Sequence, residues 1–387
     1  MFPTKEFKYF DFFCVIEGLF KVLLSKLSVN RSVNLLFFYL FFSVFVLIFI
    51  FKPPFHFFLL NALFIHVYSL VALIFSFFYR VKRKYIIIFF IFLFPLSYLT
   101  IMDRVTAAYP LVVALFSLLI ISDKFQFHNY SCRNLTHFIL ISTVLFSFLF
   151  LYESHIDHYS LVNGDPNYTS LILLTVLLIS FVFSVSNKLK VLVLLLMLFV
   201  VYLTKSRTAI LALAAFFLCC KIKRKLLLFY FILFVSIASQ YFFSYIFPSI
   251  LSDLDFGHSR FFDLNDASNM ERITIYKEAV DFILSHFTHF IINGVTNYLE
   301  INKLATNIPH NWFIQFILGF GFLFSIYYLA VVVFVAKIVS GKSYYLLAFM
   351  CFFFVYASFL SYYSLATPLL FLVLSLFVCH SIERVAR

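Results

Sequence analysis

Long apolar segments recur along the whole chain, separated by short polar connections. A helix needs roughly 18 or more apolar residues to cross the hydrocarbon core of a bilayer. We count twelve candidate spans, at about 33–51, 55–79, 85–101, 105–122, 137–152, 168–186, 189–204, 207–220, 226–247, 311–336, 343–360 and 364–381. The pattern predicts an all-α polytopic membrane protein.

The segment before the first span differs from the rest. Between Lys8 and Ser28, polar or small residues recur every three or four positions on an otherwise apolar helix. This spacing predicts an amphipathic helix on the membrane surface, and the alternative is a poorly packed first span. Composition agrees with a membrane protein, since 64% of the residues are hydrophobic, 12% are charged and the mean hydropathy is +1.03. A soluble domain could not bury so much apolar surface.

Charge sets the orientation of the spans. With the N-terminus in the cytoplasm, 21 of the 29 Lys and Arg residues fall on the cytoplasmic side and 12 of the 17 acids fall outside. The positive-inside rule favours this arrangement, with both termini cytoplasmic in the bacterial inner membrane. Orientation therefore explains the net charge of +12, and no nucleic-acid partner is needed.

Three regions follow from this map. Residues 1–247 form an N-terminal membrane region of nine spans, residues 248–310 form the largest external loop, and residues 311–387 form a C-terminal region of three spans. The sequence contains no metal-ligand spacing, P-loop or dinucleotide fingerprint, so neither a metal nor another cofactor is expected. All six Cys residues map to the cytoplasmic side or the membrane, so no disulfide is expected.

Two external arginines are out of place for a membrane protein. Arg207, in "LTKSRTAIL", lies in the first turn of a span with Ser206 as the predicted N-cap. Arg272, in "ERITIYKEAVDF", follows Ser268 and Glu271, whose capping-box spacing places it in the first turn of an external helix. A cation at a helix N-terminus opposes the helix dipole, so an anion is expected nearby. The partner is either an external acid or lipid headgroup, or an anionic ligand such as a diphosphate.

The end of the large loop reads "PHNWFIQFILGFG". Pro309 fixes the start of the next span and Asn311 can cap it, while the helix dipole disfavours a charged His310 there. A neutral histidine could accept a proton from a sugar hydroxyl, and the simpler interpretation is an interfacial histidine. In "GDPN", Asp165 as N-cap and Pro166 as first helical residue explain the motif structurally. Asp165, Asn167, Asn311 and Arg260 complete the predicted substrate-binding set.

These motifs together resemble the O-antigen polymerase and O-antigen ligase superfamily of the bacterial envelope. "GDPNY", "LTKSRTAIL", "ERITIYKEAVDF" and "PHNWFIQFILGFG" occur in that order over roughly residues 160–335. The resemblance implies about a dozen spans, a large periplasmic loop and a metal-independent glycosyltransferase. The donor of such an enzyme is a glycan on undecaprenyl diphosphate. The resemblance also implies catalytic roles for three residues: Arg207 and Arg272 would bind the diphosphate, and His310 would act on the acceptor hydroxyl.

Polymerase and ligase share these motifs and differ in the acceptor. A polymerase extends a carrier-linked repeat unit, whereas a ligase transfers the glycan to lipid A-core. Ligases often carry a second histidine shortly before the "HN" histidine, and this chain has Ile308 there, so polymerase is favoured. Chain-length regulator and flippase proteins are the candidate protein partners. A lipid-linked glycan flippase or transporter is the remaining alternative, although it would more often show ionisable residues within the membrane.

Overall fold

The computed structural model describes residues 105–124, 166–184, 186–241, 267–295, 298–305, 307 and 309–360, together with isolated residues at 69–91 and 369–376. The regular elements within these ranges are α-helices. Those discussed are α5 (Val105–Lys124), α7 (Pro166–Phe183), α8 (Asn187–Thr204), α9 (Arg207–Lys221), α10 (Lys225–Tyr241), α12 (Ala267–Ser285), α13 (Phe287–Phe290), α14 (Tyr298–Ile301), α15 (Trp312–Ser340) and α16 (Tyr344–Ala357).

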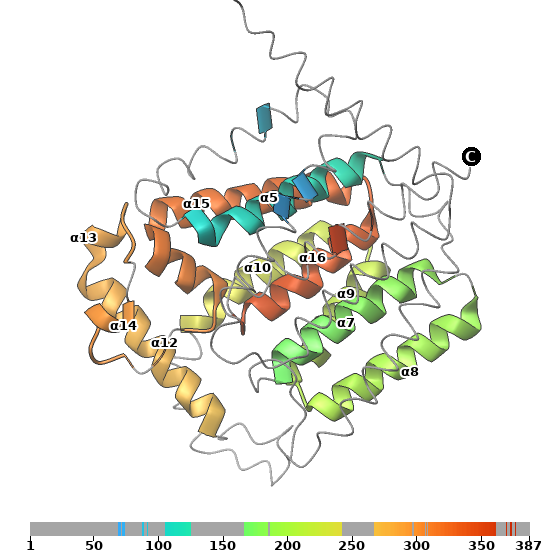
Figure 1. The fold of residues 1–387 in the computed structure, drawn as a ribbon, viewed down its shortest axis with the longest axis horizontal. Helices are drawn as coiled ribbons and strands as arrows, with labels where there is room; N and C mark the ends of the chain where they lie inside the picture. The colour runs from blue at the N-terminus through green and yellow to red at the C-terminus, as the bar shows by residue number, and fades with distance from the viewer. Residues whose placement is uncertain are drawn as a thin grey trace, which may run out of the picture.

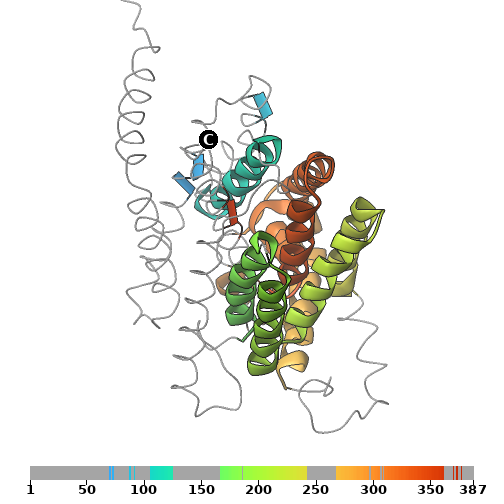
Figure 2. The same cartoon turned by 90° about the vertical axis from the view of Figure 1, so that its right-hand side faces the viewer.

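The long helices form a bundle, with α16 packed against α9 and α10 and with α7 packed against α8 (Figures 1 and 2). Short connections make successive helices antiparallel. The α8–α9 turn contains only Lys205 and Ser206, and Lys205 lies in the left-handed region at φ 47°. Helices α12, α13 and α14 form a separate group at one end of the bundle, beside the start of α15 (Figure 1).

Aromatic residues fill the centre of the bundle. Trp312 is 2% exposed and packs edge-on against Phe354 of α16, with a ring-centroid distance of 5.4 Å. Phe216 of α9 contacts Phe349 of α16 in the same manner at 5.2 Å. Edge-to-face pairs of this kind add about 0.5–1.5 kcal/mol each beyond simple burial. α16 is accordingly buried almost throughout.

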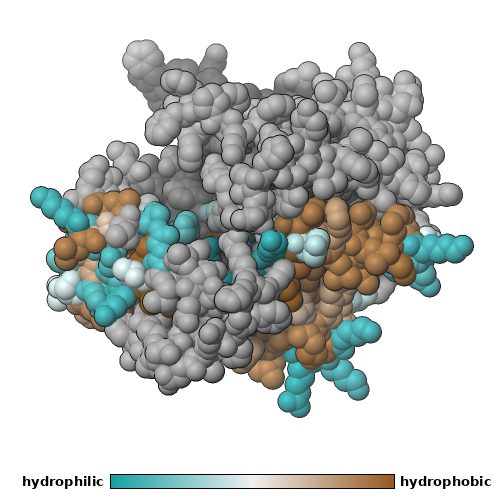
Figure 3. Space-filling model, turned by 90° about the horizontal axis from the view of Figure 1, so that it is seen from below, coloured by the Kyte–Doolittle hydropathy of each residue, from teal (hydrophilic) through white to brown (hydrophobic). Residues whose placement is uncertain are grey.

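Other helices expose apolar side chains instead. The exposed residues of α8 include Val191, Leu192, Leu194, Leu195, Leu198, Phe199 and Tyr202. Figure 3 shows hydrophobic surface over the described helices, with hydrophilic groups projecting at its margins. Among the described residues, α7, α8 and α15 are long and apolar enough to cross a membrane. Apolar surface left open on such helices is what a lipid environment accommodates.

Helix α15 is interrupted at Gly321, which has φ 81° and ψ 172°. The loop after α13 crosses the break: the N–H of Val295 donates to the carbonyl of Leu318 (2.6 Å), and the N–H of Leu323 donates to that of Ile291 (3.1 Å). A Cβ atom on Gly294 would lie 2.2 Å from the backbone of Gly319. Glycine is therefore needed where the two backbones meet, and the crossing fastens the α12–α14 group to α15.

The expected spans at 105–122, 168–186, 189–204, 207–220, 226–247, 311–336 and 343–360 correspond to described helices over the residues that the structure describes, and two features differ from expectation. α12 begins at Ala267, so Ser268 lies inside the helix and Arg272 lies in its second turn. The predicted capping box and first-turn position of Arg272 are wrong, because the helix starts further upstream. The break at Gly321 was also not expected. The predicted surface helix at Lys8–Ser28 and the span at 137–152 lie outside the described residues, as do most of the first three spans and of the last span, at 364–381.

Candidate functional site

One end of the bundle gathers the N-termini of α7, α9 and α15, and Asn311 is its most connected residue. Asn311 is fully buried, and its Oδ1 caps α15 by accepting from the N–H groups of Phe313 and Ile314. Its Nδ2 donates to the carbonyls of Ser236 and Ser358, both at 3.2 Å. Asn311 therefore confirms its predicted cap role and also ties α15 to the C-terminal ends of α10 and α16.

The motifs that contain Asn167 and Arg207 meet at the same end. Ser206 caps α9 by accepting from the N–H of Ala209, as predicted. Its hydroxyl donates to the Oδ1 atom of Asn167 at 2.7 Å, and both side chains are buried. This contact fixes the first turn of α9, where Arg207 is half-buried. The structure thus joins two segments that are 39 residues apart in the sequence.

Helix α16 connects these two groups of residues. The hydroxyl of Tyr356 donates to the Oγ of Ser170 (2.9 Å), and that Oγ donates to the backbone carbonyl of Asn167 (2.9 Å). Two residues further on, Ser358 accepts from Asn311. Buried polar groups that are all hydrogen-bonded hold a rigid arrangement, because any shift would leave a desolvated group unpaired.

Tyr276 connects the helix that carries Arg272 to the backbone of His310. The hydroxyl of Tyr276, one turn after Arg272, donates to the backbone carbonyl of His310 at 3.0 Å. Burial raises the pKa of Tyr276 to about 12, and the Arg272 charge lowers it in part. The phenol therefore remains a protonated donor at neutral pH. α12 is thus anchored to the residue that precedes the cap of α15.

The backbone around His310 is held on both sides. The Nε2 of Gln315 donates to the carbonyl of Pro309 at 2.6 Å, and Asn311 is fixed by its cap and its two interhelical hydrogen bonds. His310 itself is half-buried, and its Nδ1 atom is shielded from solvent. A side chain on so constrained a backbone can be oriented toward a reacting group at little further cost in entropy.

The described basic residues are divided unequally between the two ends of the bundle. The site end carries Lys205 in the α8–α9 turn, Arg207 at the start of α9, Arg272 and Lys277 on α12 and Lys303 after α14, together with the acids Glu271, Glu278 and Asp281 of α12. The opposite end carries Lys188, Lys190, Lys221, Lys223, Arg224, Lys225, Lys337 and Lys342. There Lys342 pairs with Asp123 at 3.2 Å. This separation agrees with the positive-inside pattern read from the sequence.

Not every predicted site residue can be located. Asp165 and Arg260 lie outside the described residues, whereas Asn167, Asn311, Arg207, Arg272 and His310 lie within them. Tyr276 and Ser236 are not among the predicted site residues. Tyr276 lies at one of the apolar positions of α12, and Ser236 lies within an apolar span, so neither position gives a local signal of a site. Ser236 is buried and accepts a hydrogen bond from the indole N–H of Trp312 at 2.8 Å.

Comparison with known proteins gives one match. Residues 192–329 match the family model described as O-antigen ligase. This match supports the resemblance to the O-antigen polymerase and ligase superfamily that the motifs suggest. No curated protein and no solved structure matches it. The O-antigen ligase match begins within α8 and ends within α15, so it includes Arg207, Arg272 and His310.

The O-antigen ligase match supports a membrane-embedded, glycosyltransferase-like enzyme, and it gives no support to a flippase. Asn167 and Ser170 precede the matched range, yet hydrogen bonds connect them to Ser206 and Tyr356. No group of three or more potential metal ligands occurs among the described residues. Asn167, Asn311, Ser206, Arg207, Arg272 and His310 bring amides, a hydroxyl, guanidinium groups and an imidazole to the site end, and such groups suit anionic and hydroxyl-bearing substrates.

Proposed function

We propose that this protein is a polymerase of O-antigen or a related surface polysaccharide, acting at the periplasmic face of the inner membrane. It would transfer a growing glycan from undecaprenyl diphosphate to a hydroxyl of another carrier-linked repeat unit. The observation that carries the proposal is the hydrogen bond from Tyr276 to His310, because it brings the Arg272 helix to the histidine. Arg207 supplies a second guanidinium at the same end of the bundle.

The proposed reaction needs no redox step. The acceptor hydroxyl oxygen attacks the anomeric carbon of the donor glycan, and the bond from that carbon to the diphosphate oxygen breaks. His310 accepts the hydroxyl proton or orients the hydroxyl, while undecaprenyl diphosphate leaves with the electron pair. Arg207 and Arg272 would stabilise the charge that develops on the diphosphate, because a guanidinium presents a fork of donors that never loses its charge. No metal is required in this scheme.

The proposed topology places the site outside the cytoplasm. Twelve spans with both termini in the cytoplasm put residues 248–310 in the periplasm, where carrier-linked glycans are used. The basic residues at the opposite end of the bundle support this orientation. Asp165 and Arg260 are proposed to contribute to the substrate-binding surface beside Asn167, whereas Asn311, which is fully buried and hydrogen-bonded, is proposed to hold the backbone at His310 in place.

O-antigen ligase is the second candidate, since it is the description of the matching family. Ile308, where many ligases carry histidine, favours the polymerase. A gel of lipopolysaccharide from a deletion strain separates the alternatives. Loss of a polymerase leaves core capped with one repeat unit, whereas loss of a ligase leaves bare core and accumulated carrier-linked polymer. A repeat unit trapped on the cytoplasmic side would contradict both candidates and indicate a flippase.

A further inference from the structure

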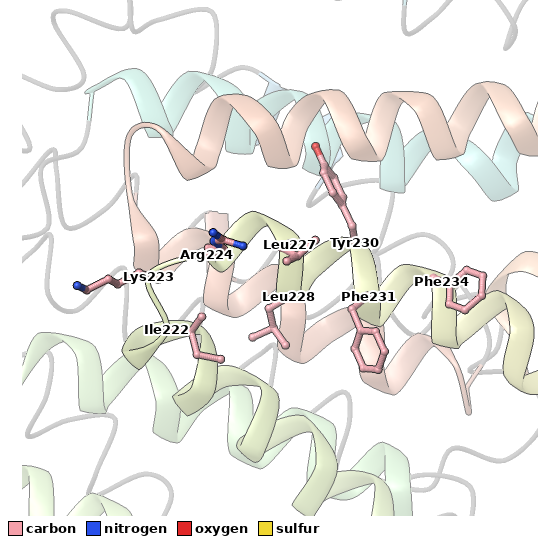
Figure 4. Close-up of a pocket in the computed structure, with 8 residues that line it drawn as sticks. All are labelled: Ile222, Lys223, Arg224, Leu227, Leu228, Tyr230, Phe231 and Phe234. Atoms are coloured by element: carbon pink, nitrogen blue, oxygen red, sulfur yellow. The ribbon is translucent and has the colours of Figure 1, made fainter.

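A groove runs along α10 at the basic end of the bundle, away from the candidate site. Its volume is about 740 Å³, and its lining begins at the α9–α10 connection and continues along the first half of α10 (Figure 4). Pockets of roughly 300–1,000 Å³ are typical of small-ligand sites. The groove is separate from the polar residues around His310, so glycan transfer does not explain it.

The wall of the groove is apolar and exposed. Leu227, Phe231 and Phe234 are 59%, 61% and 67% exposed, respectively. Their spacing of four and three residues places them on one face of α10. The distance along the helix from Arg224 to Phe234 is about 15 Å at 1.5 Å per residue, which is half of the ~30 Å hydrocarbon core. The apolar wall therefore has the depth of one membrane leaflet.

Two cations lie at the other end of this wall. Lys223 and Arg224 are exposed and line the same groove, as Figure 4 shows. No ion pair of either residue occurs among the described parts of the chain. The positive end of the α10 dipole adds to their field. A ligand that suits the whole groove would therefore have an anionic head and an apolar tail.

We propose that this groove binds one anionic phospholipid from the leaflet at the basic end of the bundle. The lipid phosphate contacts Lys223 and Arg224, and an acyl chain lies along Leu227, Phe231 and Phe234. A second copy of the chain fits the charges less well, because a two-fold axis along the membrane normal would bring the two pairs of cations together. The negative surface potential of the cytoplasmic leaflet concentrates suitable lipids there.

Native mass spectrometry of the purified full-length protein tests the proposal. Phosphatidylglycerol and phosphatidylethanolamine with the same acyl chains are titrated against the wild type and a Lys223→Gln/Arg224→Gln variant. Loss of two interfacial cations is expected to weaken phosphatidylglycerol binding roughly 25-fold and to leave phosphatidylethanolamine binding unchanged. A Lys188→Gln/Lys190→Gln variant is the matched control, because it removes two cations from the start of α8 at the same end. Equal losses in both variants, or no loss in the first, would overturn the proposal.

A second variant tests the apolar half of the groove. Leu227→Trp keeps both cations and narrows the groove, so it should lower phosphatidylglycerol binding about tenfold or more, by the loss of acyl-chain contact area. Wild-type binding by Leu227→Trp would mean that surface charge alone holds the lipid, which contradicts a groove site. A dimer signal that disappears in these variants, with no change in bound lipid, would identify a second copy as the occupant and also contradict the proposal.

Discussion

The two ends of the helix bundle differ in how their polar side chains are placed. At the end with the α15 N-terminus, Asn311, Ser206 and Asn167 are buried and hydrogen-bonded to other helices. At the opposite end, Lys223 and Arg224 are exposed, and Lys342 is about half exposed in its pair with Asp123. At the first end, polar side chains hold the helices in fixed relative positions. At the second end, charged side chains are exposed to the surroundings of the protein.

This difference agrees with our proposal that the chemistry takes place at the first end. A buried polar network is costly unless every member is satisfied, so it holds its members in fixed positions. Exposed cations are screened and contribute little to geometry. His310 and Arg207 border the rigid network, while the basic end carries the cations from which we infer the membrane orientation. The effects of substitutions at the two ends should therefore differ in kind as well as in size.

The largest effect is expected for His310→Ala. Loss of a general base typically costs about 10²–10⁴-fold in rate, so transfer of carrier-linked glycan by the purified protein should nearly stop. The fold should survive, because Asn311 supplies the cap and Tyr276 bonds only the backbone at this position. His310→Gln separates the two roles: restored activity would mean that the imidazole orients the hydroxyl without accepting its proton. Full activity of the Ala variant would exclude a catalytic role.

The arginines come next. Arg207→Lys and Arg272→Lys keep the charge and lose the bidentate fork. Losing this contact should cost about 2–5 kcal/mol, which lowers the rate of transfer roughly 30- to 3,000-fold. Both proteins should insert normally and make little polymer. Lys188→Gln, at the basic end, is the control and should make polymer of normal length. Wild-type polymer from both Lys variants would show that the arginines are structural.

The caps at the two ends should differ in stability. Asn311→Ala removes a helix cap and two interhelical hydrogen bonds and should cost about 2–4 kcal/mol in the free energy of unfolding. Ser343 caps α16 at the basic end with a single 3.4 Å hydrogen bond from Leu346, so Ser343→Ala should cost about 0.5–1 kcal/mol. Unfolding curves in detergent measure both changes. Equal destabilisation would remove the proposed difference between the ends.

The smallest effect is expected for Tyr276→Phe. One hydrogen bond has a net value of about 0.5–1.5 kcal/mol, which predicts a 2- to 13-fold fall in kcat at an unchanged KM. In a His310→Ala background the same change should have no further effect on kcat, because Tyr276 acts through His310. Tyr298→Phe is the control, since Tyr298 belongs to the same apolar cluster and bonds Asn302 instead. Independent, additive losses would contradict this positioning role.

Much of this organisation could be predicted from the sequence, because caps and apolar periods are local signals. Ser206 and Asn311 were recognised from their position before apolar runs, and both caps are confirmed. The start of α12 was misplaced, since Ser268 and Glu271 have capping-box spacing while the helix begins one residue earlier than the predicted cap. A local motif cannot exclude an earlier start when the preceding residues also tolerate a helix.

Contacts between distant segments could not be predicted. Gly294 meets the backbone of Gly319, and Gly321 meets the backbone of Ile292 and Asn293. The glycines alone give no sign in the sequence of these partners. The same holds for Ser236, whose two bonds to Trp312 and Asn311 span about 75 residues. Hydropathy places such residues in a span and leaves their neighbours undefined.

The most direct test of the account asks which compartment each end of the bundle faces. Reporter fusions after Asn265 in the large loop, and after Lys223 and Lys342 at the basic end, measure this in cells. The account predicts a periplasmic signal at Asn265 and cytoplasmic signals at Lys223 and Lys342. A cytoplasmic signal at Asn265 would contradict it, because the site around His310 would then face away from the carrier-linked glycans that it is proposed to join.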